Sequence, residues 1–186
     1  VTRAVKVWLQ NREIDGPDAG DPASLGRCDR LLSVHLDLAR WAAQRLTRAL
    51  GLGAPVAEAV EAGAGVHDLG KRDTRWQTAL GNPDPAVPLA KSRRTAFDTR
   101  LNDGYRHELG SVIRLGDQLS PLARHLVAAH HGWARPSFTD KAREKPGASP
   151  EADRIAGAFT ELNAQYGLWG LAYLEALVKS ADVLAE

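Results

Sequence analysis

The residues best suited to chemistry in this chain are a histidine and an aspartate that follow each other, His67 and Asp68. They belong to a longer series of the same two residue types: His35, His67-Asp68, His107, His130-His131 and Asp182. Imidazole and carboxylate groups bind divalent transition metals. Two metals on shared ligands can stabilise both the attacking and the leaving oxygen when a phosphodiester is hydrolysed. The series therefore predicts a two-metal hydrolytic centre.

The apolar pattern predicts that helices position these residues. Apolar residues recur at three- and four-residue spacing from about residue 30 to residue 50, and this period indicates an amphipathic helix. Further helices are expected at 55–67, with Gly70 as the stop signal, and at 72–80, 107–115, 121–131, 151 onward and 169–184. Turn formers fill residues 15–26, 81–104 and 133–150. We expect an all-α bundle with two long irregular loops.

Length and composition are consistent with one folded domain. The chain has 186 residues, 44% of them hydrophobic, and its 24 basic and 23 acidic residues nearly cancel. No global electric field therefore draws it to nucleic acid. We expect residues 1–30 to form an N-terminal extension or linker, in which Val5, Val7 and Leu9 alternate as in a short strand, and residues 31–186 to form the catalytic domain.

The sequence also predicts the cellular compartment. The only cysteine, Cys28, cannot form an internal disulfide, which is typical of a reducing cytosol, and a cytoplasmic location is expected. A catalytic role for this lone thiol is weighed against an ordinary buried or partly exposed cysteine. We find no apolar run of membrane-spanning length and no signal peptide. Methionine is absent even at position 1, so we expect the chain to come from a longer protein.

Each candidate ligand also has a structural interpretation. Taken singly, His35 or His107 on an apolar helix is more often a core histidine, and Asp182 could be an exposed carboxylate at a helix end. Lys71 is either a solvated lysine or a cation directed at a phosphate. A helical bundle can gather ligands from separate helices at its centre, and this convergence favours the metal site.

The adjacent histidines leave more than one possibility open. His130 and His131 are two ligands, one ligand with a residue that orients it, or a surface pair at a frayed helix end. His125, five and six residues earlier, faces elsewhere and is expected to be structural or exposed. Gly70 is expected to let the backbone turn sharply after the His-Asp pair.

Two other patterns bear on nucleic acids. Residues 65–71 match most of a phosphate-binding loop, but Arg72 replaces the required Ser or Thr and the preceding segment is helical, so this interpretation is rejected. Basic residues gather in 91–106 and 135–145, with Trp76, Tyr105, Trp133 and Phe138 in or near them. Such segments either bind single-stranded nucleic acid through phosphate pairing and base stacking or are solvated loops with core-anchoring aromatics.

The ordered series resembles the HD phosphohydrolase superfamily, and more narrowly the HD nuclease domain of type I CRISPR-associated helicase-nucleases. The resemblance covers residues 31–186 and is carried by His67-Asp68-Leu69-Gly70-Lys71, Trp76-Gln77, His107-Glu108 and His130-His131-Gly132. The first 30 residues match no pattern of this family, and no helicase is present in the chain. The resemblance implies an HD-domain helical bundle that binds two metals.

It also implies roles for particular residues. By this likeness one metal is held by His35, His67, Asp68 and Asp182, and a second by His107, His130 and His131, with Asp68 bridging. Asp68 and Lys71 are the catalytic candidates. The many imidazole ligands favour Mn, Fe, Ni or Co over Mg, which prefers oxygen.

The implied activity is hydrolysis of the displaced single-stranded DNA in CRISPR interference, an antiviral defence. The implied partners are a helicase, fused or separate, and an RNA-guided surveillance complex. Two alternatives remain: a phosphohydrolase that acts on nucleotides or cyclic nucleotides with the same metals, and a non-catalytic domain that keeps the fold for docking or sensing.

Overall fold

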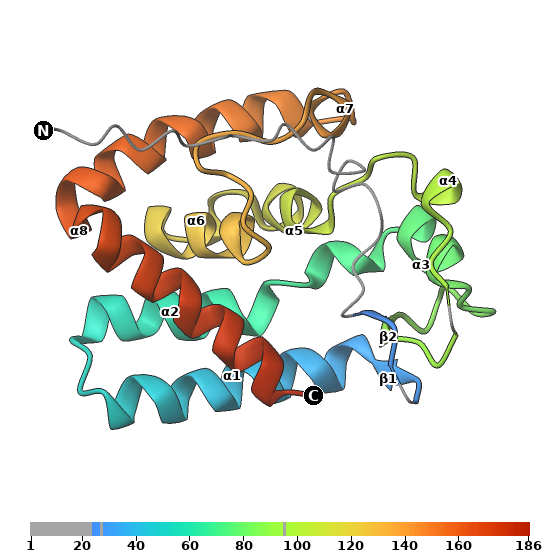
Figure 1. Ribbon diagram of the computed structural model, residues 1–186, viewed down its shortest axis with the longest axis horizontal. Coiled ribbons are helices and arrows are strands. Elements are labelled where there is room, and N and C mark those ends of the chain that lie inside the picture. The colour runs from blue at the N-terminus through green and yellow to red at the C-terminus, as the bar shows by residue number, and fades with distance from the viewer. Residues whose placement is uncertain (1–23, 27, 95) are drawn as a thin grey trace, which may run out of the picture.

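The computed structural model describes residues 24–26, 28–94 and 96–186, and this part of the chain is mostly helical (Figure 1). The all-α prediction is therefore confirmed. In chain order the elements are β1 (Arg30–Leu31), α1 (Leu32–Ala49), α2 (Ala54–Val66), the 3-10 helix η2 (Leu69–Arg72), α3 (Thr74–Leu80), β2 (Leu89–Lys91), α4 (Thr99–Asn102), α5 (His107–Leu115), the 3-10 helix η3 (Gly116–Gln118), α6 (Pro121–Ala129), α7 (Asp140–Arg143) and α8 (Ala148–Leu184).

The element boundaries differ from the sequence prediction in a few places. The predicted stop at Gly70 is wrong, because α2 ends at Val66 and Gly70 lies inside η2. The two irregular loops contain short elements that their Pro and Gly content concealed, namely β2, α4 and α7. The predicted strand near Val5 lies outside the described residues. In the described part of the chain, no helix has the length and apolar character needed to cross a lipid bilayer.

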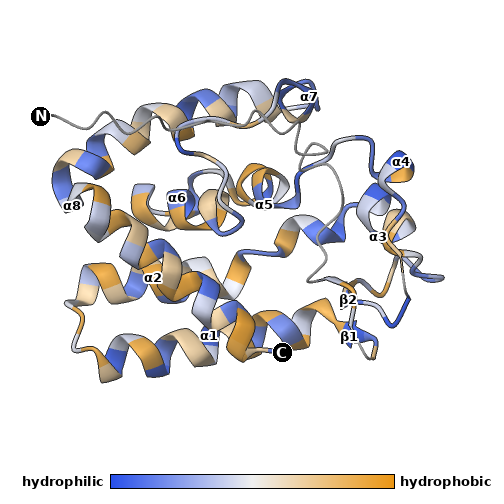
Figure 2. Ribbon diagram, in the orientation of Figure 1, coloured by the Kyte–Doolittle hydropathy of each residue, from blue (hydrophilic) through white to orange (hydrophobic). Residues whose placement is uncertain are grey.

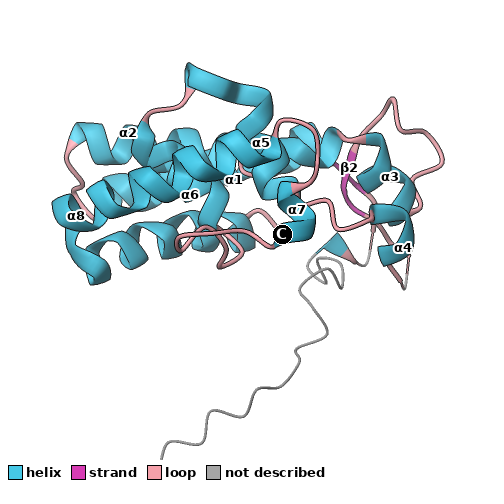
Figure 3. Ribbon diagram, turned by 90° about the horizontal axis from the view of Figure 1, so that it is seen from above, coloured by secondary structure: helices cyan, strands magenta, loops and turns pink. Residues whose placement is uncertain are grey.

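The core forms around α6. Every residue from Leu122 to His130 is buried, and α6 packs against α2, α5 and α8. Figure 2 shows apolar residues along α2, α5 and α6, and Figure 3 shows the same bundle from above. The N-terminal end of α6 is fixed by Ser120, whose hydroxyl accepts a hydrogen bond from the Ala123 N–H, and by Pro121 in the first turn.

The last helical segment is broken where the sequence predicts two helices. Gly167 in α8 has φ 70° and ψ 159°, which no helix allows, so α8 consists of two helices joined at this residue. The second one runs back across α1 and α2 (Figure 1). Arg30, just before α1, donates hydrogen bonds to the carbonyl groups of Ala185 and Glu186. The start of α1 and the end of α8 are thus held together.

Gln77 connects the small β1–β2 strand pair to the helices. Its amide nitrogen donates to the carbonyl of Lys71 at 2.6 Å and to that of Leu89 at 2.9 Å, and its oxygen accepts from the Leu89 N–H at 2.9 Å. The side chain is fully buried. A glutamine at this position therefore fixes η2 against β2. Its place in the Trp76-Gln77 motif reflects this structural role and not a role in the chemistry of the site.

Gly70 is required by a close approach between η2 and α5. A Cβ atom at this residue would lie 2.0 Å from the His107 carbonyl oxygen and 2.7 Å from the Ser111 nitrogen. Its φ is not in the left-handed region, so the expected sharp turn is not the reason for glycine. The Gly70 N–H instead donates to Ser111 Oγ at 2.7 Å, which joins the segment after His67 and Asp68 to α5.

We expect Gly70→Ala to lower the free energy of unfolding by about 1–3 kcal/mol or more, because both atoms that the new methyl group meets are backbone and cannot move aside. The matched control is Gly157→Ala, where nothing lies within 4 Å of the added Cβ and the site is in the exposed face of α8. That change should stabilise the helix by about 0.5–1 kcal/mol. Urea unfolding measures both, and equal stabilities for the two variants would contradict the packing argument.

Candidate metal centre

The structure brings all seven predicted ligands to one place, between the ends of α2 and α6 and the inner faces of α1, α5 and α8. His35 lies on α1, His107 begins α5 and Asp182 lies near the end of α8. His67 and Asp68 follow the last residue of α2, and His130 and His131 follow that of α6. Six of the seven are buried and His131 is half-buried. The structure therefore excludes an exposed helix-end position for Asp182, which is 5% exposed.

One oxygen of Asp68 faces the first group of ligands. Asp68 Oδ2 lies 3.5 Å from Nε2 of His35 and 3.5 Å from Nε2 of His67. On the other side of these rings, Asp182 Oδ1 lies 3.2 Å from the same atom of His35 and 3.4 Å from that of His67. The ligand atoms of His35, His67 and Asp68 all lie within 4.8 Å of one another. This spacing suits a single cation among two imidazoles and two carboxylates.

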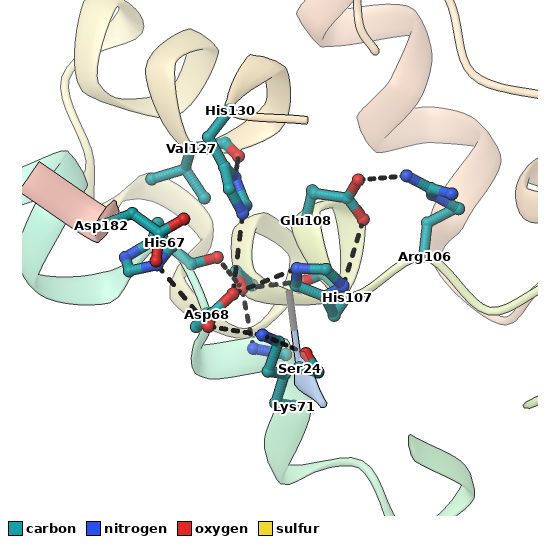
Figure 4. A network of polar contacts seen from close by, with 12 residues as sticks. Ser24, His67, Asp68, Lys71, Arg106, His107, Glu108, Val127, His130 and Asp182 are labelled. Atoms are coloured by element: carbon teal, nitrogen blue, oxygen red, sulfur yellow. Dashed lines mark hydrogen bonds and ion pairs between the residues drawn. The ribbon is translucent and has the colours of Figure 1, made fainter. Parts of the chain in front are cut away.

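The other oxygen of Asp68 faces the second group. Asp68 Oδ1 lies 3.1 Å from His107 Nε2 and 3.6 Å from His130 Nε2 (Figure 4). With His131, these residues form a second set whose ligand atoms lie within 4.8 Å of one another. The two oxygens of one carboxylate thus point into two adjacent clusters. That is the arrangement a bridging ligand would have.

Three of the imidazole rings are held so that each presents its Nε2 atom inward. His67 Nδ1 lies 2.8 Å from the Ala64 carbonyl and His130 Nδ1 lies 2.6 Å from the Val127 carbonyl. A carbonyl can only accept, so Nδ1 carries the proton and Nε2 keeps a free lone pair. His107 Nδ1 instead faces the Glu108 carboxylate at 3.4 Å. This outer partner is what metal-binding histidines usually have.

These inward atoms lack the partners that buried polar atoms need. Five of them have no hydrogen-bond partner among the described residues and are shielded from solvent: Asp68 Oδ1 and the Nε2 atoms of His35, His67, His107 and His130. Leaving one such atom unpaired costs about 1–3 kcal/mol. Bound cations would compensate all five atoms at once, so the donor set fits divalent metals.

Charge interactions in the cluster shift several pKa values. Burial favours the neutral form of Asp68, yet Lys71 and His67 outweigh it and hold the pKa of this carboxyl well below its usual range. Burial likewise opposes ionisation of Asp182, but the neighbouring imidazoles of His35 and His67 lower its pKa strongly. Burial lowers the pKa of His130, and the neighbouring His67 and His107 lower it further. Ionised carboxylates and a neutral imidazole are the forms that bind metals.

Lys71 is part of the cluster and not a solvated lysine. Its side chain is 3% exposed, and Nζ lies 2.7 Å from Asp68 Oδ2. The same nitrogen donates to Ser24 Oγ at 2.8 Å (Figure 4). A cation at this position offsets the charge of the shared carboxylate and sits at the edge of the first ligand group.

Three residues that support the centre were not predicted from the sequence. Glu108 is fully buried, and its other oxygen pairs with Arg106. Burial opposes its ionisation, but His107 and Arg106 lower its pKa far below the usual range. Ser111 Oγ lies 2.7 Å from the His67 carbonyl and 2.8 Å from that of His107. Of these, only Glu108, next to His107, had a signal in the sequence; Ser111 and Ser24 contact the site across the fold.

Of the two interpretations of the aromatic residues near the basic loops, the structure favours core anchoring for three of the four. Trp76, Tyr105 and Phe138 are 2%, 6% and 4% exposed, and only Trp133 is half-buried. Trp76 packs its ring against His107, with centroids 4.5 Å apart, and Tyr105 donates its hydroxyl proton to the Gly70 carbonyl at 2.9 Å. Both residues support the walls of the centre.

His125 has the structural role expected of it. It is buried on α6, and its Nε2 lies 2.7 Å from Glu175 Oε1. Glu175 also pairs with Arg135, which follows the two histidines at the end of α6. This chain of contacts connects α6, the segment after His131 and α8, and so connects helices that carry ligands of both groups.

Cys28 is an exposed free thiol.

We expect Glu108→Gln to weaken binding of one of two metals by roughly 10- to 100-fold, because the amide cannot hold the His107 Nδ1 proton as a carboxylate does. The control is Glu151→Gln, which alters a buried carboxylate that faces Arg124 instead of a histidine. Manganese titration by calorimetry measures each site. Unchanged affinity at both sites, or equal losses in the two variants, would contradict the role given to Glu108.

Comparison with known proteins agrees with this geometry. No curated protein and no solved structure matched the chain significantly. The profile of the family described as "Cas3, HD domain" matches residues 28–182, which include all seven ligand candidates. HD domains of this family are metal-dependent hydrolases that work with a helicase on nucleic acid in CRISPR systems. The chain therefore belongs to the family of HD domains of Cas3-type CRISPR helicase-nucleases.

Proposed function

We propose that this chain hydrolyses phosphodiester bonds of single-stranded DNA during CRISPR interference, as an antiviral nuclease. One observation carries the proposal: the two oxygens of buried Asp68 face two separate histidine clusters. Two cations bridged by one carboxylate could contact the attacking and the leaving oxygen of the same phosphate. When bound, the metals supply Lewis acidity and lower the pKa of a water molecule.

The protein's own residues prepare this centre. His35, His67, Asp68 and Asp182 would hold one metal, and His107, His130 and His131 the other, with Asp68 shared. Because carbonyl groups accept the outer Nδ1 protons of His67 and His130, the inner Nε2 atoms of these two rings face the metal sites. Lys71 would hold the scissile phosphate from the side of Asp68. Mn, Fe, Ni or Co suits five imidazoles better than Mg.

The proposed partners follow from the family. We propose that a helicase, fused or separate, unwinds the target and that an RNA-guided surveillance complex recruits it. The displaced strand would then reach the metal centre as single-stranded DNA. The near-neutral charge of the chain agrees with delivery by a partner, because no global field attracts DNA to this domain.

A second candidate is hydrolysis of nucleotides or cyclic nucleotides. The enclosure of the centre favours it, since six ligands are buried and His131 alone is half-buried. A small substrate enters an enclosed centre more readily than a polymer. A panel of nucleotides and cyclic nucleotides beside circular single-stranded DNA separates the two candidates, and turnover of the panel alone would replace our proposal.

For the metal-stripped protein, we expect Mn or Ni to restore cleavage of circular single-stranded DNA, and Mg to restore much less, because the ligand set is rich in nitrogen. Asp68→Ala should remove several kcal/mol of transition-state stabilisation, a loss of roughly 10³-fold in rate. Asp37→Ala, an exposed aspartate on α1, is the matched control and should keep full activity. Best activity with Mg would contradict the assigned ligands, and an active Asp68→Ala variant would refute the shared carboxylate.

A second prediction concerns Lys71. We expect Lys71→Met to lower kcat on DNA by roughly 10- to 100-fold while both metals remain bound, because a positioned phosphate contact of this kind stabilises the transition state. Lys179→Met is the control, since Lys179 Nζ lies 2.7 Å from Asp182 Oδ2 but the side chain is 39% exposed. Metal content is measured together with single-turnover rates. Normal kcat in the metal-loaded Lys71→Met protein would reduce Lys71 to a charge partner of Asp68.

A further inference from the structure

Most cations of the two basic loops are already paired with carboxylates. In residues 91–106 and 135–145, seven of the nine basic side chains lie within ion-pair distance of an acid: Lys91 with Glu186, Arg93 with Asp29, Arg106 with Glu108, Arg135 with Glu175, Lys141 and Lys145 with Asp103, and Arg143 with Asp153. The loops therefore offer far less free positive charge than their composition indicates.

Two arginines differ from the rest. Arg94 and Arg100 are exposed, and within the described residues neither guanidinium has an ion pair or a hydrogen bond. The side chain of Arg94 nevertheless packs against the protein, because it lies across Gly81 at the end of α3. A Cβ atom there would come within 2.5 Å of its Cδ and Nε atoms. Gly81 has φ 75°, so glycine serves both the helix end and this contact.

Both arginines line the same hollow, together with Phe97. It has a volume of about 400 Å³ and lies between α3 and α4. This volume is within the usual range of ligand sites, roughly 300–1,000 Å³. The one acid in its wall, Asp98, accepts hydrogen bonds from the N–H groups of Arg100 and Leu101. Its charge is thus partly satisfied by backbone donors, and the hollow stays net positive.

The hollow is next to the metal centre. The ring of Phe97 packs against Trp76 with centroids 4.8 Å apart, and Trp76 also packs against the His107 ring at 4.5 Å. Phe97 is half-buried and lines the hollow. Trp76 thus contacts both the aromatic wall of the hollow and a predicted ligand of the second metal.

We propose that this hollow is a nucleotide-binding subsite that holds a segment of single-stranded DNA beside the scissile phosphate. Arg94 and Arg100 bind backbone phosphates, and Phe97 stacks on an unpaired base. The combination of free guanidinium groups and an aromatic face is what single strands require, whereas a base inside a duplex has no free face to offer. The inference rests on the proposed nuclease function and adds the residues that align the strand.

The test measures binding of a fluorescent 12-nucleotide phosphorothioate oligonucleotide, which resists cleavage, to the metal-loaded protein at several salt concentrations. We expect Arg94→Ala/Arg100→Ala to bind at least tenfold more weakly. The slope of log K against log salt should also fall by about 1.4, since each phosphate contact on a single strand contributes about 0.7. Phe97→Leu should bind roughly fivefold or more weakly with an unchanged slope, because stacking involves no counterion release.

The matched control is Arg45→Ala/Arg48→Ala, which removes two exposed arginines from the far end of α1 (Figure 1). It should change affinity less than twofold. Wild-type affinity and slope in Arg94→Ala/Arg100→Ala, or equal losses in the control pair, would overturn the subsite. Hydrolysis of bis(p-nitrophenyl) phosphate, too small to reach the hollow, should be unchanged in all variants. Absence of that hydrolysis in the wild type would count against the nuclease, while the binding data still decide the subsite.

Discussion

The structure depends on one buried charge, the carboxylate of Asp68, which is 1% exposed. A carboxylate in such a position is costly unless cations or donors surround it. Lys71 at 2.7 Å and the histidines on both sides supply that compensation, and bound metals would supply more. The hydrophobic core brings the surrounding elements together at this residue, and their side chains then share its charge.

Packing around Asp68 is set by backbone contacts more than by the ligands themselves. The segment after α2 lies so close to α5 that only glycine fits at position 70. Ser111 joins the two carbonyl groups of His67 and His107, residues that belong to different ligand groups. Gln77 fixes the other side of η2 against β2. The relative position of the two clusters is therefore determined by main-chain geometry before any metal binds.

The sequence predicted the helices well, and the ligand candidates that it singled out lie together in the structure, because both follow from local signals. Helical periodicity is a local property, and six histidines are few enough that their order along the chain carries information. Contacts across the fold were not predictable in this way. Ser24 and Ser111 are ordinary serines until η2 comes to lie beside them. The same holds for Gly70. Glycine is required there by the close approach of His107, 37 residues away, and not by a turn at Gly70 itself.

For the aromatic residues, the sequence left two interpretations open. Trp76 and Tyr105 lie near basic residues in the sequence, which suggested base stacking, but large aromatic side chains gain more from burial than from exposure on a loop. In the structure they form the wall between the metal centre and the solvent-facing loops. Half-buried Phe97, which the sequence did not single out, has the partly open face that stacking needs.

The pairing of charges explains how a nearly neutral domain could act on DNA. Carboxylates neutralise most basic loop residues, so long-range attraction is weak and association with free DNA is slow. Under the proposed function, the remaining recognition would be short-range, through metals at the centre and a few cationic contacts beside it. Such a domain would cut poorly on its own and well when a strand is fed to it at high local concentration. Low intrinsic affinity would then protect DNA that no partner has delivered.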